Sequence, residues 1–267
     1  RWLNDGMLTQ LGHVTRRRDG THSEELGICR KSARDIFTEA SWERAFAWYD
    51  DAANREHHVP LIVKANRISK VHRRVPLDLF VLPECEGEDL VGLSVYAGIW
   101  TSAAMAAKPG QVPRLRTQLG ALMDDLRFDP SGHAGKALVH ALTTLPHDLL
   151  IGFSDDDIRR VATTMMSLVD RPRPRVTIVE APLARHLFAF VWLPRDLMST
   201  DVRRRIQAMI EDVTGSRMID WSLEIEGGPL ALIRLVLDFR EGADSVDEEA
   251  VEQRLQDMLR GWPEAVE

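Results

Sequence analysis

The sequence predicts an α+β fold, in which antiparallel sheets carry helices on one face and a helical segment connects two domains. Three observations support this class. The C-terminal part shows strand and helix patterns in the order ββαββα, which is typical of a ferredoxin-like sandwich. Three helical stripes precede it, and the N-terminal part is rich in strand patterns. The expected domains are residues 1–110, 111–170 and 171–267.

The N-terminal part combines several strand patterns with one helical pattern. Short apolar stretches bounded by turn residues predict strands, namely Met7–Thr15, Pro60–Lys64, Val75–Leu82 and Leu90–Trp100. A helix is expected across Ser41–Asn54.

The middle segment is predicted to be helical because its apolar residues recur at helical spacing. The three stripes are Leu115, Leu119, Leu122, Met123 and Leu126; Ala137, Leu138, Ala141 and Leu142; and Ile158, Val161, Met165 and Leu168. Ser154 is expected to cap the third helix, whose first turn holds Asp155–Asp157, where carboxylates favour the helix dipole. Arg171-Pro172 ends this helix and marks the expected domain boundary.

The C-terminal domain shows the clearest pattern of the chain. Four strands are expected, over Val176–Val179, Leu187–Leu193, Ile219–Ile225 and Leu230–Phe239. One helix is expected over Val202–Val213, closed by Gly215, and another begins at Asp247. Gly227-Gly228 is expected to turn the chain between the last two strands.

One of these strands alternates strictly between apolar and polar residues. The apolar residues Ile219, Trp221, Leu223 and Ile225 are separated by Asp220, Ser222 and Glu224. This alternation predicts a strand whose apolar face is buried and whose polar face is wet, which fits a sheet covered on one side only.

Composition and charge narrow the possible functions. Hydrophobic residues make up 44% of the 267 residues, but no apolar run approaches the roughly 18 residues of a membrane span. No signal peptide is seen, and the two cysteines, Cys29 and Cys85, lie far apart, so we expect a protein of the reducing cytoplasm. Residues 1–150 carry 19 Lys+Arg and 19 Asp+Glu, whereas residues 151–267 carry 15 and 22. The acidic C-terminal part should repel nucleic acid.

No motif for catalysis, nucleotide binding or metal binding is found. The sequence lacks GxGxxG, GxxxxGK[ST], GxSxG, HExxH and paired CxxC motifs. The adjacent His57 and His58 are interpreted as a solvated pair. We therefore predict no catalytic, cofactor-binding or metal-binding residue in this chain.

Positive charge is concentrated in the segment KANRISKVHRRVP, residues 64–76. A nucleic-acid groove, an anion site and a solvated loop between two strands are the alternatives. Because the segment has no interleaved aromatic residues, nucleic-acid binding is not favoured. We expect Lys64, Arg67, Arg73 and Arg74 to lie in or beside a strand-connecting loop, as anion or interface contacts.

The carboxylates nearest in sequence to this segment are the expected partners of its cations. They are Asp78 and the acidic tip Glu84–Asp89. Since exposed ion pairs contribute only about 0–1 kcal/mol each, single substitutions here should barely change stability.

Several segments, in the same order, resemble the large bacterial NAD-dependent glutamate dehydrogenases. They are RWLNDGMLTQLGHV, ELGICR, KANRISKVHRRVPLD, GLSVYAGIWTSAAM, GHAGKALVHALTTLPHDLL, RPRPRVTIV with FVWLPRDLMSTDVRRRIQ, GGPLALIRLVL and GWPEAVE. One departure is that the arginine of the family's SPLAR-type strand is replaced here by Leu232.

The resemblance implies tandem ACT-like domains in the N-terminal regulatory region of such an enzyme. It implies a non-catalytic regulatory or assembly segment, whose partners are the catalytic domain of the same polypeptide, neighbouring subunits and an amino-acid effector. The complete enzyme would oxidise L-glutamate with NAD, and its catalytic residues would lie outside this chain. The alternative is a free-standing amino-acid-sensing ACT-like adaptor protein without catalysis.

The resemblance also indicates a candidate effector site at PRDLMST, residues 194–200. ACT-like domains typically bind an amino acid at the loop between a strand and the following helix. Here Arg195 would hold a ligand carboxylate and Asp196 an ammonium group, while the free N–H groups near Ser199 and Thr200 would bind an anion. The alternative is that Ser199 only caps the helix, with Arg195 and Asp196 paired in solvent.

Overall fold

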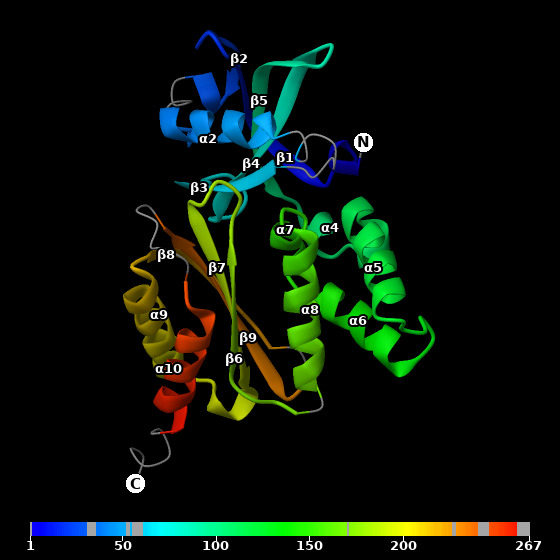
Figure 1. The fold of residues 1–267 in the computed structure, drawn as a ribbon. Coiled ribbons are helices and arrows are strands. Elements are labelled where there is room, and N and C mark those ends of the chain that lie inside the picture. Colours follow the sequence, from blue (N-terminus) through cyan, green and yellow to red (C-terminus); the bar gives the residue numbers. More distant parts are fainter. Residues whose placement is uncertain are drawn as a thin grey trace. The chain divides into compact units, whose positions relative to one another are not determined.

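The computed structural model describes residues 2–30, 36–51, 54, 61–169, 171–225, 228–239 and 246–260. The chain forms two compact units (Figure 1). The first unit comprises Arg1–Thr117 with Pro146–Phe153, and the second comprises Gln118–Leu145 with Ser154–Glu267. The predicted pair His57-His58, Gly227 of the predicted turn and the terminal GWPEAVE lie outside the described residues.

A five-stranded antiparallel sheet forms the centre of the first unit. Its strand order is β2-β1-β5-β4-β3. The strands are β1 (Leu8–Arg17), β2 (His22–Gly27), β3 (Leu61–Ile68), β4 (Pro76–Glu86) and β5 (Asp89–Trp100). Four of these strands were predicted and are confirmed, whereas β2 was not predicted.

The first unit also contains short helices and one longer helix. They are η1 (Trp2–Asn4), α2 (Glu39–Asp50), α4 (Ser102–Met105), η2 (Pro109–Gln111) and α7 (His147–Leu150). Thr38 caps α2, and the buried residues Trp42, Ala45 and Tyr49 form the apolar face of this helix. The Tyr49 hydroxyl donates to the Val81 carbonyl of β4 at 2.6 Å, so α2 packs against the sheet.

The three predicted helices of the middle segment are confirmed. They are α5 (Pro113–Asp125), α6 (His133–Thr144) and α8 (Asp155–Val169). The Ser154 hydroxyl accepts from the Asp157 N–H at 3.1 Å, which is the expected N-cap. The boundary between the units falls within α5, whereas α6 and α8 both belong to the second unit.

The second unit contains the predicted ββαββα pattern. Its elements are β6 (Arg175–Glu180), β7 (His186–Pro194), η3 (Arg195–Leu197), α9 (Thr200–Thr214), β8 (Arg217–Glu224), β9 (Leu230–Asp238) and α10 (Glu248–Arg260). The four strands form an antiparallel sheet in the order β6-β7-β9-β8. Gly215 closes α9 in the left-handed conformation, with φ of 62°. The α+β class is therefore confirmed.

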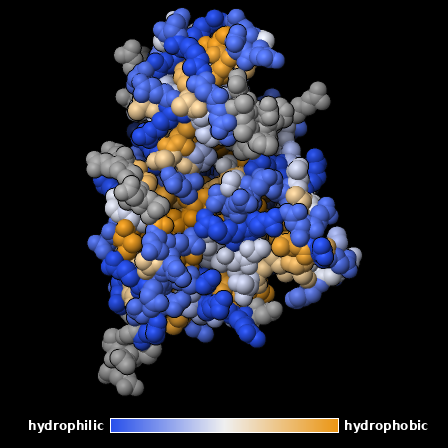
Figure 2. Space-filling model, viewed as in Figure 1, coloured by the Kyte–Doolittle hydropathy of each residue, from blue (hydrophilic) through white to orange (hydrophobic). Residues whose placement is uncertain are grey.

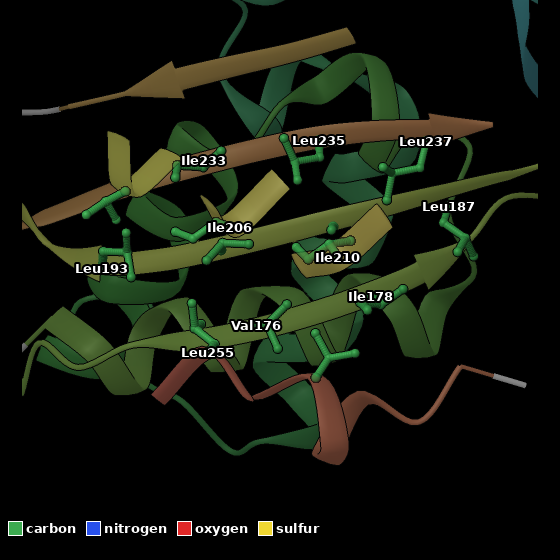
Figure 3. Close-up of a cluster of buried hydrophobic side chains, with 14 of the residues drawn as sticks. Val176, Ile178, Leu187, Leu193, Ile206, Ile210, Ile233, Leu235, Leu237 and Leu255 are labelled. Atoms are coloured by element: carbon green, nitrogen blue, oxygen red, sulfur yellow. The ribbon is translucent and has the colours of Figure 1, made fainter. Parts of the chain in front are cut away.

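Aliphatic side chains from one face of this sheet meet the two helices α9 and α10 (Figure 3). The sheet supplies Val176, Ile178, Leu187, Leu193, Ile233, Leu235 and Leu237. Ile206 and Ile210 of α9 and Leu255 of α10 complete the cluster. Each of these residues is at most 7% exposed, so this is the hydrophobic core of the domain.

The opposite face of the same sheet is also covered, contrary to the expectation of a wet face. Phe188, Phe190 and Trp192 alternate with the core residues of β7 and are at most 4% exposed. Helix α8 lies on this side of the sheet (Figure 1). Its Arg160 guanidinium donates to the Ile178 carbonyl at 2.8 Å. The middle segment thus supplies a second layer that the strand pattern alone did not indicate.

The two faces of β8 are reversed relative to the prediction. Its apolar residues Trp221 and Leu223 are 41% and 37% exposed, because β8 is an edge strand that α9 only partly covers. On its polar face, Ser222 accepts from Arg234 at 3.0 Å, and Asp220 pairs with Arg234 at 3.4 Å. The alternation of residues correctly separated the apolar face of β8 from its polar face, but it did not indicate which of the two faces would be covered.

Hydrophilic residues predominate over the face of the molecule that Figure 2 shows, with smaller apolar patches between them. Among the helices of the described residues, none combines the length and the apolar character that crossing a bilayer requires.

Candidate functional site

The cations of the segment 64–74 occupy two different environments. Lys64 lies inside β3 and is buried, whereas Arg67, Lys70, Arg73 and Arg74 are exposed at the end of β3 or in the loop that leads to β4. His72 takes a positive φ of 58° in this loop. The segment is therefore not one continuous patch of exposed positive charge.

Lys64 is the centre of a buried ion cluster in the first unit. Its Nζ lies 2.6 Å from Oδ1 of Asp78 and 2.9 Å from Oδ2 of Asp148. Lys64 and Asp78 are directly paired across β3 and β4, and Asp148 comes from the short helix α7. The three side chains are only 6%, 3% and 10% exposed, respectively.

The charges of this cluster do not balance when all three groups are ionised. Two carboxylates face one ammonium group, so the fully ionised cluster carries a net charge of about −1 away from water. Burial raises the pKa of Asp78 from 3.8 to about 6; Lys64 opposes this shift, and Asp148 adds to it. The cluster is therefore expected to take up one proton in mildly acidic solution.

The arrangement acts as a structural brace between β3, β4 and α7. Removing one member of a buried ion pair typically costs about 3–5 kcal/mol, because the remaining charge is left uncompensated. The expectation that Lys64 lies in or beside a loop and forms only exposed pairs is wrong, so we expect its substitution to cost more stability than substitution of the exposed cations. Asp78 is confirmed as one of its partners.

The remaining predicted contact residues lie near the surface. The Arg73 guanidinium donates to the Trp100 carbonyl at the end of β5, whereas the Arg67 and Arg74 side chains are exposed. In the acidic tip, Glu86 lies 3.7 Å from Arg17, and Glu84 accepts from the Ser94 hydroxyl at 2.5 Å. An anion or interface role for the exposed cations stays a prediction.

The candidate effector loop lies at one end of the sheet in the second unit. Ser199 caps α9, since its hydroxyl accepts from the Val202 N–H at 3.1 Å. Arg195 and Asp196 form the exposed turn η3, in which the Arg195 N–H donates to the Pro229 carbonyl at 2.8 Å. Thr200 is the exposed first residue of α9. Effector binding at this loop stays a prediction.

Asp148 is the functional residue that the sequence patterns did not reveal. It is separated from Lys64 by 84 positions, and short-range pairing rules do not reach that far. One signal was available. Asp148 is an acidic residue in the apolar stretch LPHDLLI, where a carboxylate would be buried and would need a cation.

Among the described residues, no group of three or more His, Cys, Asp or Glu side chains is placed to hold a metal ion. Cys29 is fully buried, and this burial raises the pKa of its thiol to about 11, which keeps it protonated and unreactive.

Two adjacent regions of the chain match models of one protein family. Residues 112–171 match helical motif 1 of glutamate dehydrogenase, and residues 175–263 match the glutamate dehydrogenase ACT2 domain. The first match covers α5, α6 and α8, and the second covers the ββαββα domain.

Two similar proteins match almost the whole chain, and a third matches about half of it. An NAD-specific glutamate dehydrogenase of Halomonas elongata is 26% identical over 98% of this chain and 17% of its own length. One from Pseudomonas aeruginosa is 27% identical over the same shares. One from Mycobacterium tuberculosis is 22% identical over 55% of this chain and 9% of its own length. The chain thus spans about a sixth of the length of the first two relatives.

Proposed function

Because this chain belongs to the glutamate dehydrogenase family, we propose that it is a non-catalytic regulatory and assembly segment of a large NAD-dependent glutamate dehydrogenase. Helical motif 1 and the ACT2 domain of that family lie next to each other in its sequence. The observation that carries the proposal is the match of 98% of the chain to only 17% of much longer dehydrogenases. The complete enzyme would convert L-glutamate and NAD to 2-oxoglutarate, ammonia and NADH in the cytoplasm.

The absence of catalysis within this segment is supported by its sequence. The 267 residues contain no GxGxxG fingerprint with which to hold the pyrophosphate of NAD. Asp78, whose pKa burial raises to about 6, lies in a buried ion cluster rather than in an open pocket. Cofactor binding and hydride transfer would therefore take place elsewhere in the parent polypeptide.

The regulatory part of the proposal places an amino-acid effector at the loop of Arg195, Asp196, Ser199 and Thr200. Arg195 and Asp196 are exposed beside the N-terminus of α9, a 15-residue helix. A cationic side chain, an anionic side chain and free N–H groups near one another suit the carboxylate and ammonium groups of an amino acid.

The assembly part rests on the free edge of the ACT2 sheet. Strand β8 is an edge strand, and it carries the exposed Trp221 and Leu223 next to Ile225, which is 44% exposed. Exposed apolar edge strands are sites of strand pairing between chains. We assign this edge to contact with the same strand of a neighbouring subunit.

Effector titration of the full-length parent enzyme tests the regulatory role. Arg195→Ala with Asp196→Ala should abolish the response of glutamate oxidation to at least one amino acid. The matched control is Arg204→Ala with Glu249→Ala, which removes the same two charges from exposed positions on α9 and α10. If every effector response survives the first pair, the loop only caps a helix.

The reading frame beyond Glu267 distinguishes this proposal from a free-standing amino-acid-sensing adaptor. A frame that continues into a dinucleotide-binding fingerprint supports the dehydrogenase segment, and a stop codon supports the adaptor.

A further inference from the structure

The two edges of the four-stranded sheet in the second unit differ in what lies against them. Strand β8 forms one edge and carries the exposed side chains of Trp221 and Leu223. Strand β6 forms the other edge, and side chains from helices α8 and α10 bind its backbone. Because an open edge can pair with a strand of another chain, this difference bears on how copies of the chain associate.

The peptide groups at the outer edge of β6 follow from its pairing with β7. In an antiparallel pair, alternate residues direct both their N–H and their carbonyl toward the neighbouring strand. The Ala181 N–H donates to the His186 carbonyl of β7 at 2.8 Å. By alternation, Thr177 and Val179 also direct their peptide groups toward β7. Ile178 lies between these two residues, so its N–H and its carbonyl point outward near the middle of the edge.

Both outward groups of Ile178 are bound by side chains from α10 and α8, which lie on opposite faces of the sheet (Figure 1). From α10, Oε2 of Glu248 accepts from the Ile178 N–H at 2.7 Å. From α8, Nη2 of Arg160 donates to the Ile178 carbonyl at 2.8 Å. Nη1 of Arg160 donates to the same Glu248 oxygen at 2.6 Å. The three residues therefore form a closed ring of hydrogen bonds over the edge.

Two further contacts support this ring. Asp157, which lies one turn before Arg160 on α8, accepts from Nη2 of Arg160 at 3.0 Å. A second ion pair crosses the same edge, since alternation places Arg175 on the α8 face of β6 while its Nη1 lies 2.5 Å from Oε1 of Glu252 on α10. Glu252 follows Glu248 by one helical turn, so α10 presents two carboxylates along the β6 edge.

An incoming strand would need the peptide groups that this ring already uses. Paired strands lie about 4.8 Å apart and exchange backbone hydrogen bonds. Pairing at Ile178 would therefore displace both Arg160 and Glu248 from the edge. Hydrogen bonds between charged groups are roughly twice as strong as those between neutral groups, so replacing them with ordinary strand pairing is unfavourable.

We propose that Arg160 and Glu248 form an edge guard that closes β6 against strand pairing, so that copies of this sheet pair edge to edge through β8 alone. The consequence concerns the size of the assembly. When β8 pairs with β8 of a second copy, both open edges are used and growth stops. If β6 were open as well, β6 of one copy could pair with β8 of the next, and chains would grow without a limit. The partner that the edge guard excludes is thus a further copy of this chain.

The role of β8 in this inference rests on the proposed assembly function, whereas the edge guard on β6 does not. If subunits meet through another surface, substitutions in β8 leave the oligomer of the parent enzyme unchanged. Removal of the edge guard still exposes β6 in that case. The two proposals can therefore fail separately.

Sedimentation velocity of the 267-residue chain tests the edge guard. Arg160→Ala with Glu248→Ala removes both side chains from the edge and leaves the net charge unchanged. We expect this variant to form larger species as its concentration rises from about 10 to 200 μM, with an average mass at least about twofold above that of the original chain. The matched control is Arg254→Ala with Asp212→Ala, which removes an ion pair of 3.1 Å between α10 and α9 and should change nothing.

Hydrogen exchange at the lowest of these concentrations keeps the test valid if the variant is less stable. The Ile178 N–H should exchange at least about tenfold faster in the variant, whereas the Thr177 and Val179 N–H groups, which bond to β7, should keep their rates. Equal acceleration of all three would show that Arg160 and Glu248 hold the strand in place, and would overturn the proposal. An unchanged mass distribution would overturn it too, as would the same growth in the control variant.

Discussion

At the scale of single residues, the environment of a charged side chain decides how much that side chain contributes to the stability of the fold. Lys64 and Lys70 lie six positions apart in one basic segment, yet Lys64 is buried between two carboxylates and Lys70 is exposed. Asp78 could be predicted as a partner because it lies close in sequence. Asp148 could not be predicted as a partner of Lys64, because a contact between residues 84 positions apart depends on the fold of the whole unit.

A matched pair of substitutions measures this difference. Lys64→Met leaves two buried carboxylates facing each other, so we expect it to lower the free energy of unfolding by about 3–5 kcal/mol. Lys70→Met makes the same chemical change on the surface, and its effect should stay within about 0.5 kcal/mol. Urea denaturation of both variants checks the prediction. Similar midpoints for the two would show that the cluster stabilises nothing.

The same cluster predicts how stability depends on pH. The pKa of Asp78 is about 6 in the folded chain, above its ordinary value of 3.8. Between about pH 4 and pH 6, the Asp78 carboxyl group is therefore protonated to a greater extent in the folded chain than in the unfolded chain. The contribution of Asp78 is therefore fully present below about pH 4, is lost as the pH rises through 6, and is constant above that.

Asp78→Asn tests this pH dependence, because asparagine resembles the protonated carboxyl group and leaves Lys64 paired with Asp148. Unfolding free energies measured between about pH 4 and 7 should decline less steeply in the variant than in the original chain. Parallel curves would contradict the assignment of the proton to this cluster.

At the scale of elements, periodicity predicted the helices better than it predicted the strands. The stripes of α5, α6, α8, α9 and α10 were visible because each helix buries one face. Strand β2 has the sequence HSEELG and is mostly exposed, so it lacks alternation and forms only through pairing with β1. The covered second face of β7 was missed because strand patterns do not identify the layer that packs on them.

The cap of α9 offers a prediction at this scale. Ser199→Ala removes the acceptor of the Val202 N–H, so we expect a loss of about 1 kcal/mol in the free energy of unfolding. Ser199→Asp keeps an acceptor at the cap and should retain most of the stability. The adjacent Thr200→Ala is the control. Thermal unfolding that does not separate Ser199→Ala from Thr200→Ala would contradict the role of the cap.

At the scale of the whole molecule, we propose that the edge strand β8 pairs subunits of the parent enzyme. Trp221→Glu with Leu223→Glu places charges on the exposed edge without touching the core. We expect these substitutions to lower the oligomeric state of the parent enzyme in sedimentation velocity, because like charges would face each other across paired strands. An unchanged oligomer would show that subunits meet through another surface.

The central claim is that this segment regulates and assembles an enzyme whose chemistry takes place elsewhere. The measurement that tests it most directly is NADH formation from L-glutamate and NAD, followed for the purified 267-residue chain and for the full-length parent at equal concentration. We predict steady turnover by the parent and none by the chain alone. Glutamate-dependent NADH formation by the isolated chain would contradict the account.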